Sequence, residues 1–107
     1  MAVIDTSPLS EAGRSGPTTV HLSGDIDVFS SPELHGQLLS ALEHCTSLLI
    51  VDLSEVTFCD AGGLRVLVGI QQRALAQGIL LALTAPRPNM SRLLHITGLD
   101  RSLPVMG

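Results

Sequence analysis

The feature of this sequence that most restricts its fold is the near-continuous apolar run from Leu48 to Leu53. A run of this length suits a strand buried on both faces, as in parallel sheets that are covered by helices. Segments with apolar residues at helical spacing precede and follow it, and a second apolar strand is predicted over Ile79–Thr84. Right-handed strand–helix–strand crossovers place such helices against the sheet. The run therefore predicts an α/β fold with a mostly parallel sheet.

Two further strands are predicted before the first helix. Residues Thr18–Ser23 alternate in polarity, and Ala2–Thr6 is the expected antiparallel partner. Between them, Ser7–Pro17 is rich in Ser, Gly and Pro and is expected to be a flexible loop. The predicted order is β-β-α-β-α-β-α, with four to five strands. Because no composition break divides the chain, residues 1–107 are expected to form a single domain.

The predicted helix boundaries rest on capping residues. The first helix is expected to start within Ser30–Glu33, where a Ser is a favoured N-cap, the Pro fits the first turn and the Glu complements the helix dipole. The second is expected to end at Gly78 in a left-handed conformation. Asn89 or Ser91 is expected to open a short third helix that stops at Gly98.

The composition argues against nucleic-acid binding. Aromatic residues make up 2% of the chain and consist of Phe29 and Phe58, which is too few for base-stacking platforms. The net charge is −4, whereas a duplex-binding surface needs clustered Lys and Arg. The core is therefore expected to consist of Leu, Val and Ile, and no nucleic-acid partner is expected.

The sequence predicts a cytoplasmic protein that does not insert into a membrane. No apolar stretch approaches the roughly 20 residues that span a bilayer, and the N-terminus does not resemble a secretory signal. Cys45 and Cys59 are then expected to be reduced, as small core residues. The sequence shows no metal-ligand spacing, phosphate loop or nucleophile–base pair, so neither a cofactor nor an enzymatic activity is expected.

The start of the second predicted helix is the candidate functional site. The stretch Val51–Arg65 predicts a buried strand, a short loop and the start of an apolar helix carrying Asp60 and two glycines. Asp60 is expected to cap this helix. Unpaired backbone N–H groups and a partial positive charge at a helix start favour a phosphate or an acidic partner side chain.

Two motifs resemble those of a known family. The first is GDID at residues 24–27, and the second is DLSxVxFxD at residues 52–60 followed by GLRVL at residues 63–67. Together they resemble the STAS domain of bacterial anti-anti-sigma factors, also called anti-sigma factor antagonists. The resemblance covers roughly Val3 to Leu103.

The resemblance implies a binding module that switches partners. Such antagonists bind an anti-sigma factor, typically a histidine-kinase-like ATPase that phosphorylates them, and the unphosphorylated antagonist thereby frees a sigma factor. In the family the helix begins Asp-Ser-Ser/Thr-Gly, with the phosphoacceptor just before the Gly. Asp60 and Gly63 fit this pattern, Ala61 replaces the first Ser, and Gly62 replaces the phosphoacceptor. The expectation is a constitutive antagonist, or one that is regulated by other means.

The family also implies which residues bind the partner, namely the loop Gly24–Ser31 and the helix start Asp60–Arg65. The expected partner-binding residues are Asp25, Asp27, Ser31, Asp60, Ala61, Gly62, Gly63, Leu64 and Arg65. The alternative for Asp25 and Asp27 is a local turn role, and for Arg65 it is an exposed, solvated side chain. Cys59, at the edge of this surface, would be partly activated by the helix dipole if exposed, which would permit redox control.

Other functions remain open alongside the antagonist. STAS domains also serve as subunits of transport or lipid-trafficking ABC complexes and of larger stress-signalling assemblies, and the fold alone does not separate these roles. Hydrophobicity is high for so short a chain, which leaves open a homodimer or a partner against one helix face.

Overall fold

The computed structural model describes residues 3–8, 18–44 and 47–106. The elements in chain order are β1 (Val3–Pro8), β2 (Thr18–Ile26), α1 (Ser31–Glu43), β3 (Leu48–Cys59), α2 (Ala61–Ala76), β4 (Leu80–Thr84), α3 (Pro88–Thr97), the 3-10 helix η1 (Leu99–Arg101) and β5 (Val105–Met106).

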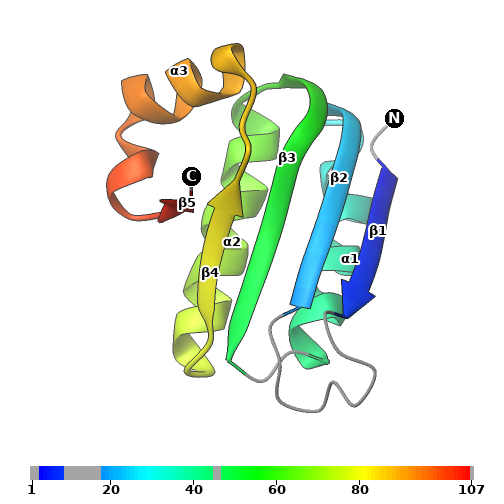
Figure 1. Cartoon of the computed structure of the whole chain (residues 1–107). Coiled ribbons are helices and arrows are strands. Elements are labelled where there is room, and N and C mark those ends of the chain that lie inside the picture. The colour runs from blue at the N-terminus through cyan, green and yellow to red at the C-terminus, as the bar shows by residue number, and fades with distance from the viewer. Residues whose placement is uncertain (1–2, 9–17, 45–46, 107) are drawn as a thin grey trace.

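The described strands form one five-stranded sheet in the order β1-β2-β3-β4-β5. Strand β1 is antiparallel to β2, and the other neighbours are parallel (Figure 1). This confirms the predicted α/β fold, the mostly parallel sheet and the antiparallel first pair. The short edge strand β5 lies in a tail for which the sequence predicts no element.

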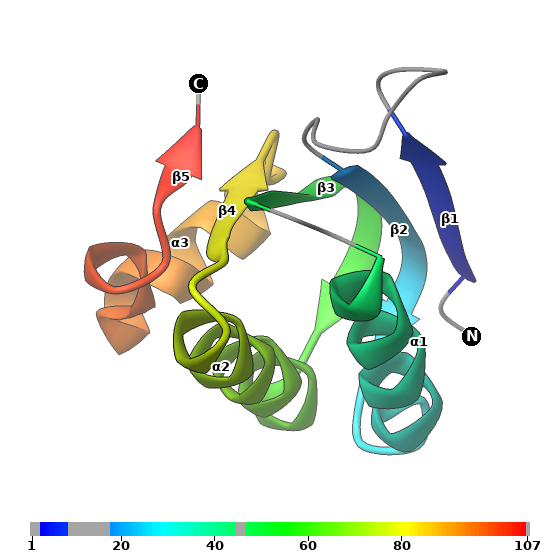
Figure 2. The same ribbon diagram turned by 90° about the horizontal axis from the view of Figure 1, so that it is seen from below.

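Helices α1 and α2 lie side by side on the same face of the sheet (Figure 2). On β3, Leu49, Val51 and Leu53 face this layer and are 0% exposed. Ile50 and Asp52, which alternate with them, are partly exposed. The prediction that this strand is buried on both faces is therefore wrong, because both long helices cover one face.

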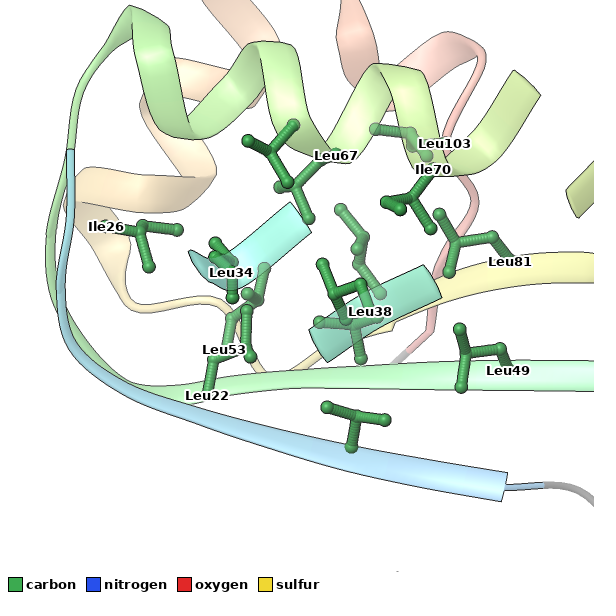
Figure 3. Packing of buried hydrophobic residues seen from close by; sticks show 14 of the residues in the cluster. Leu22, Ile26, Leu34, Leu38, Leu49, Leu53, Leu67, Ile70, Leu81 and Leu103 are labelled. Atoms are coloured by element: carbon green, nitrogen blue, oxygen red, sulfur yellow. The ribbon is translucent and has the colours of Figure 1, made fainter. Parts of the chain in front are cut away.

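The core between the sheet and these helices is aliphatic, as predicted. The labelled core side chains that come from α1 and α2 are Leu34, Leu38, Leu67 and Ile70 (Figure 3). Burying a side chain of this kind contributes about 1.5–3 kcal/mol to folding. Both aromatic residues lie outside the core, with Phe29 90% exposed and Phe58 50% exposed.

Strands β2 and β3 continue beyond their predicted ends and curl together around one end of the core (Figure 3). The last residues of β2, Gly24–Ile26, pair with Val56–Cys59 of β3, with register shifts between His21 and Ser23 and between Gly24 and Asp25. Gly24 has a φ of 82°, a conformation that favours glycine. The loop expected from Gly24 to Ser31 therefore begins only after Ile26.

Several boundaries differ from the predictions by a few residues. Strand β1 runs to Pro8, so the start of the predicted loop Ser7–Pro17 is strand, and residues 9–17 lie outside the described part of the chain. Cys45 also lies outside it.

The helix ends follow their capping signals closely. Gly78 and Gly98 adopt left-handed φ values of 73° and 78° just beyond α2 and α3, as predicted. Helix α3 begins at Pro88 rather than at Asn89 or Ser91, because Pro is favoured in a first turn. Across the described ranges, no helix combines the length and apolar character needed to cross a membrane.

Candidate functional site

The site lies at the carboxyl ends of β2 and β3, where α1 and α2 begin (Figure 1). Residues 27–30 connect β2 to α1, and Asp60 connects β3 to α2. The backbone N–H of Asp60 donates to the carbonyl of Ile26 at 3.2 Å. The two connections are therefore in direct backbone contact, and the structure brings together the two segments that the sequence predicts as one surface.

The turn before α1 is held by Asp27. Its Oδ1 accepts hydrogen bonds from the backbone N–H groups of Phe29 and Ser30, each at 3.0 Å. These bonds, first that from Ser30, lower the pKa of Asp27 below its usual value of 3.8. The turn role that the sequence offered as one reading of Asp27 is thus what the structure shows.

Ser30 also serves this turn rather than the helix. It is the N-cap residue of α1, but its side chain makes no capping hydrogen bond. Instead its Oγ accepts from the backbone N–H of Asp27 at 3.0 Å. The predicted capping by a serine side chain is therefore wrong, because the turn uses the oxygen of the N-cap serine. The next hydroxyl, Ser31 Oγ, donates to the carbonyl of Val28 at 3.1 Å.

Two apolar side chains project from this turn. Val28 is 58% exposed and Phe29 is 90% exposed. Both residues lie within the predicted binding loop Gly24–Ser31, but the sequence analysis names neither of them as a binding residue. The signal was present, because Phe29 is an aromatic residue in a short polar turn where no core position is expected. Because Val28 and Phe29 are adjacent, they form a contiguous exposed apolar patch, a feature that marks candidate contacts with another molecule.

Asp60 links the turn to the start of α2. Its Oδ1 accepts from the backbone N–H of Gly63 at 3.1 Å, so the predicted N-cap is confirmed. Its Oδ2 accepts from the backbone N–H of Val28 at 3.3 Å. One carboxylate therefore fixes both the helix start and the exposed turn.

Replacing Asp60 by alanine is expected to lower the free energy of unfolding by about 1–2 kcal/mol, because the helix loses its cap. Asp60→Asn, which keeps an oxygen acceptor at the same place, should lose less. Urea denaturation of the three proteins measures the difference. Equal midpoints for the wild type and Asp60→Ala would contradict this role.

Asp25 does not form a turn. It lies in β2, and its Oδ1 accepts a hydrogen bond from the hydroxyl of Thr57 in β3 at 2.8 Å. The local turn role that the sequence offered for Asp25 is therefore wrong. Its carboxylate joins the curled ends of the two strands.

The first residues of α2 differ in the solvent exposure of their side chains. Ala61 and Arg65 are exposed, whereas Leu64 is 7% exposed and belongs to the core. The side chain of Leu64 therefore packs in the core under the helix and is not available at the surface. An open groove of about 450 Å³ runs between α1 and α2, and Ser31 and Arg65 are among its lining residues.

Gly63 permits the close contact between the two connections. A Cβ atom at this position would lie 2.6 Å from the carbonyl oxygen of Ile26 and 2.9 Å from Sγ of Cys59. Both distances are too short for a side chain, so only glycine fits where α2 begins against β2.

The thiol of Cys59 is not activated by the helix start. Burial, with the nearby charge of Asp60, raises the pKa of Cys59 to about 12. The thiol is therefore protonated at neutral pH, and the exposure on which activation by the helix dipole depended is not present, because Cys59 packs against the core.

The Cys59 thiol is accordingly expected to react slowly with iodoacetamide at pH 7.5 in the folded protein. The rate should rise by at least about tenfold in urea, where burial is lost. Peptide mass spectrometry after timed labelling separates Cys59 from Cys45. Equal labelling rates for Cys59 in the folded and unfolded chain would contradict the prediction.

Comparison with known proteins assigns the family. The family model described as "Mlab, STAS domain" matches residues 9–106. The anti-sigma-B factor antagonist of Bacillus subtilis is 38% identical over 80 residues, which cover 75% of this chain and 72% of that protein. The anti-sigma-F factor antagonist RsfB of Mycobacterium tuberculosis is 24% identical over 102 residues, which cover 95% of this chain and 83% of that protein.

A solved structure agrees with these sequence relatives. The crystal structure of an anti-sigma factor antagonist from Mycobacterium paratuberculosis superimposes with a TM-score of 0.78 at 27% identity. The match covers 96% of this chain and 85% of that one. The chain thus belongs to the STAS domain family, alongside these anti-sigma factor antagonists.

Proposed function

We propose that this protein is an anti-sigma factor antagonist that binds a histidine-kinase-like anti-sigma factor and thereby releases a sigma factor. The observation that carries the proposal is the ordered turn that presents Val28 and Phe29 beside the start of α2. The names of the relatives support the same class of partner.

We name Val28, Phe29, Ser31, Ala61 and Arg65 the docking surface. Val28 and Phe29 lie on the turn before α1, Ser31 is the first residue of α1, and Ala61 and Arg65 lie in the first two turns of α2. The surface combines an aromatic and an aliphatic side chain with an arginine, and aromatic residues and arginine are enriched in protein interfaces. Because the turn is already ordered, binding loses little conformational entropy there.

The proposed antagonist is not controlled by phosphate at the position that the family uses. Gly62 lies there and offers no oxygen for a phosphoryl group. A phosphate would add about −1.5 to −2 charges to the surface, and a like charge on the partner would then oppose binding. Without that charge, binding is set by the amounts of the two proteins or by control at another site.

Affinity capture from the source bacterium tests the proposal. The tagged chain is used as bait, and captured proteins are identified by mass spectrometry. The expected result is a histidine-kinase-like ATPase, recovered equally by an Ile96→Ala control, because Ile96 is exposed on α3 outside the docking surface. Recovery of a membrane transport ATPase instead, or of no kinase-like protein, would contradict it and favour the transport-subunit alternative.

A further inference from the structure

The turn before α1 occupies the space that a side chain at position 62 would need. A Cβ atom on Gly62 would lie 2.9 Å from Cα of Val28 and 3.1 Å from its backbone nitrogen. It would also lie 3.1 Å from Oδ1 of Asp60. Real Cβ atoms essentially never approach another heavy atom within 3.0 Å, so some part of the turn or helix must move if a side chain is added.

The obstruction cannot be relieved by a change of rotamer. The nearest atoms belong to the backbone of Val28, and that backbone is held at both ends. Its N–H donates to Asp60 at 3.3 Å, and its carbonyl accepts from Ser31 at 3.1 Å. The next two N–H groups of the turn donate to Asp27. Moving Val28 away from position 62 therefore strains or breaks hydrogen bonds of the whole turn.

We infer that the closed turn requires glycine at position 62, so that one substitution cannot restore a phosphoacceptor here without displacing Val28 and Phe29. This inference rests on the proposed function, in which these two residues bind the anti-sigma factor. The chain lacks more than a hydroxyl, because the backbone of Val28 also lies against the place where a Cβ atom at position 62 would stand. The docking surface is thereby fixed in one arrangement. Phosphate control is lost because the backbone of the turn leaves no room for a side chain at position 62.

A pair of serine substitutions on the same helix tests the inference. Gly69 also lies on α2 and lines the same groove, but a Cβ there meets nothing within 4 Å. Gly62→Ser is expected to melt at least about 5 °C below the wild type and to shift the backbone amide NMR signals of Val28, Phe29 and Ser30. Gly69→Ser should melt at or above the wild-type temperature, because serine is the better helix former, and leave those signals in place.

The inference fails if Gly62→Ser melts as high as Gly69→Ser and keeps the amide signals of the turn. If Gly62→Ser does not fold, an NMR measurement on the wild-type protein replaces it. A strong nuclear Overhauser effect between the α-protons of Gly62 and Val28 is expected, and its absence would overturn the inference. Neither measurement needs a partner. Failure of the proposed function would instead appear as wild-type protein that captures no anti-sigma factor.

Discussion

Replacing Gly63 by alanine is expected to lower the free energy of unfolding by about 2–3 kcal/mol, the upper range for overpacking a tight site. The added methyl group would meet the carbonyl oxygen of Ile26 at 2.6 Å, and that oxygen accepts the N–H of Asp60. Relief requires β2 and α2 to separate at the point where their connections join. For a domain of this size the melting temperature should fall by about 10 °C or more.

The matched control for this prediction is Gly69→Ala on the same helix. Because a Cβ at Gly69 meets nothing within 4 Å, alanine should raise the stability there by about 0.5–1 kcal/mol. Thermal unfolding followed by circular dichroism measures both changes. If the two variants shift the melting temperature in the same direction, the close contact at Gly63 is not what the structure indicates.

Replacing Phe29 by alanine is expected to weaken binding to the anti-sigma factor by about 30-fold or more, the loss typical of an interface hot spot of 2 kcal/mol. The side chain is 90% exposed in the free protein, so its removal should leave the melting temperature within about 2 °C of the wild type. Calorimetric titration of the captured anti-sigma factor measures the affinity.

Ile96→Ala provides the control for Phe29→Ala. Ile96 is 72% exposed on α3, so the substitution removes a comparable exposed apolar side chain outside the docking surface. Its affinity should match the wild type. A Phe29→Ala protein that binds as tightly as Ile96→Ala would show that the turn before α1 is not the centre of the interface.

The elements of this fold could be predicted where the signals are local. Pro32 in the first turn of α1 and the glycines after α2 and α3 mark helix ends through their own backbone preferences. The curled ends of β2 and β3 could not be predicted in this way. Gly24–Ile26 is a poor strand sequence by itself, and it becomes strand only by pairing with Val56–Cys59, about 30 residues away.

In the candidate site, too, local contacts could be predicted from the sequence and long-range contacts could not. The cap by Asp60 follows from a favoured residue at a helix start, and the sequence predicts it correctly. The bond from Val28 to the same carboxylate and the pairing of Asp25 with Thr57 join residues 32 apart in the chain. No local pattern specifies such contacts. Phe29 lies within the predicted binding loop Gly24–Ser31, but its exposure depends on the conformation of the turn, which the motif residues do not specify.

Displacement of a sigma factor from its anti-sigma factor tests the proposed docking surface most directly. A preformed complex of the two, with the sigma factor fluorescently labelled, is titrated with the wild-type chain, and the release is followed by anisotropy. We expect release by the wild type and by Ile96→Ala, with about 30-fold more Phe29→Ala needed for the same effect. A complex that remains intact at saturating wild-type chain would contradict it.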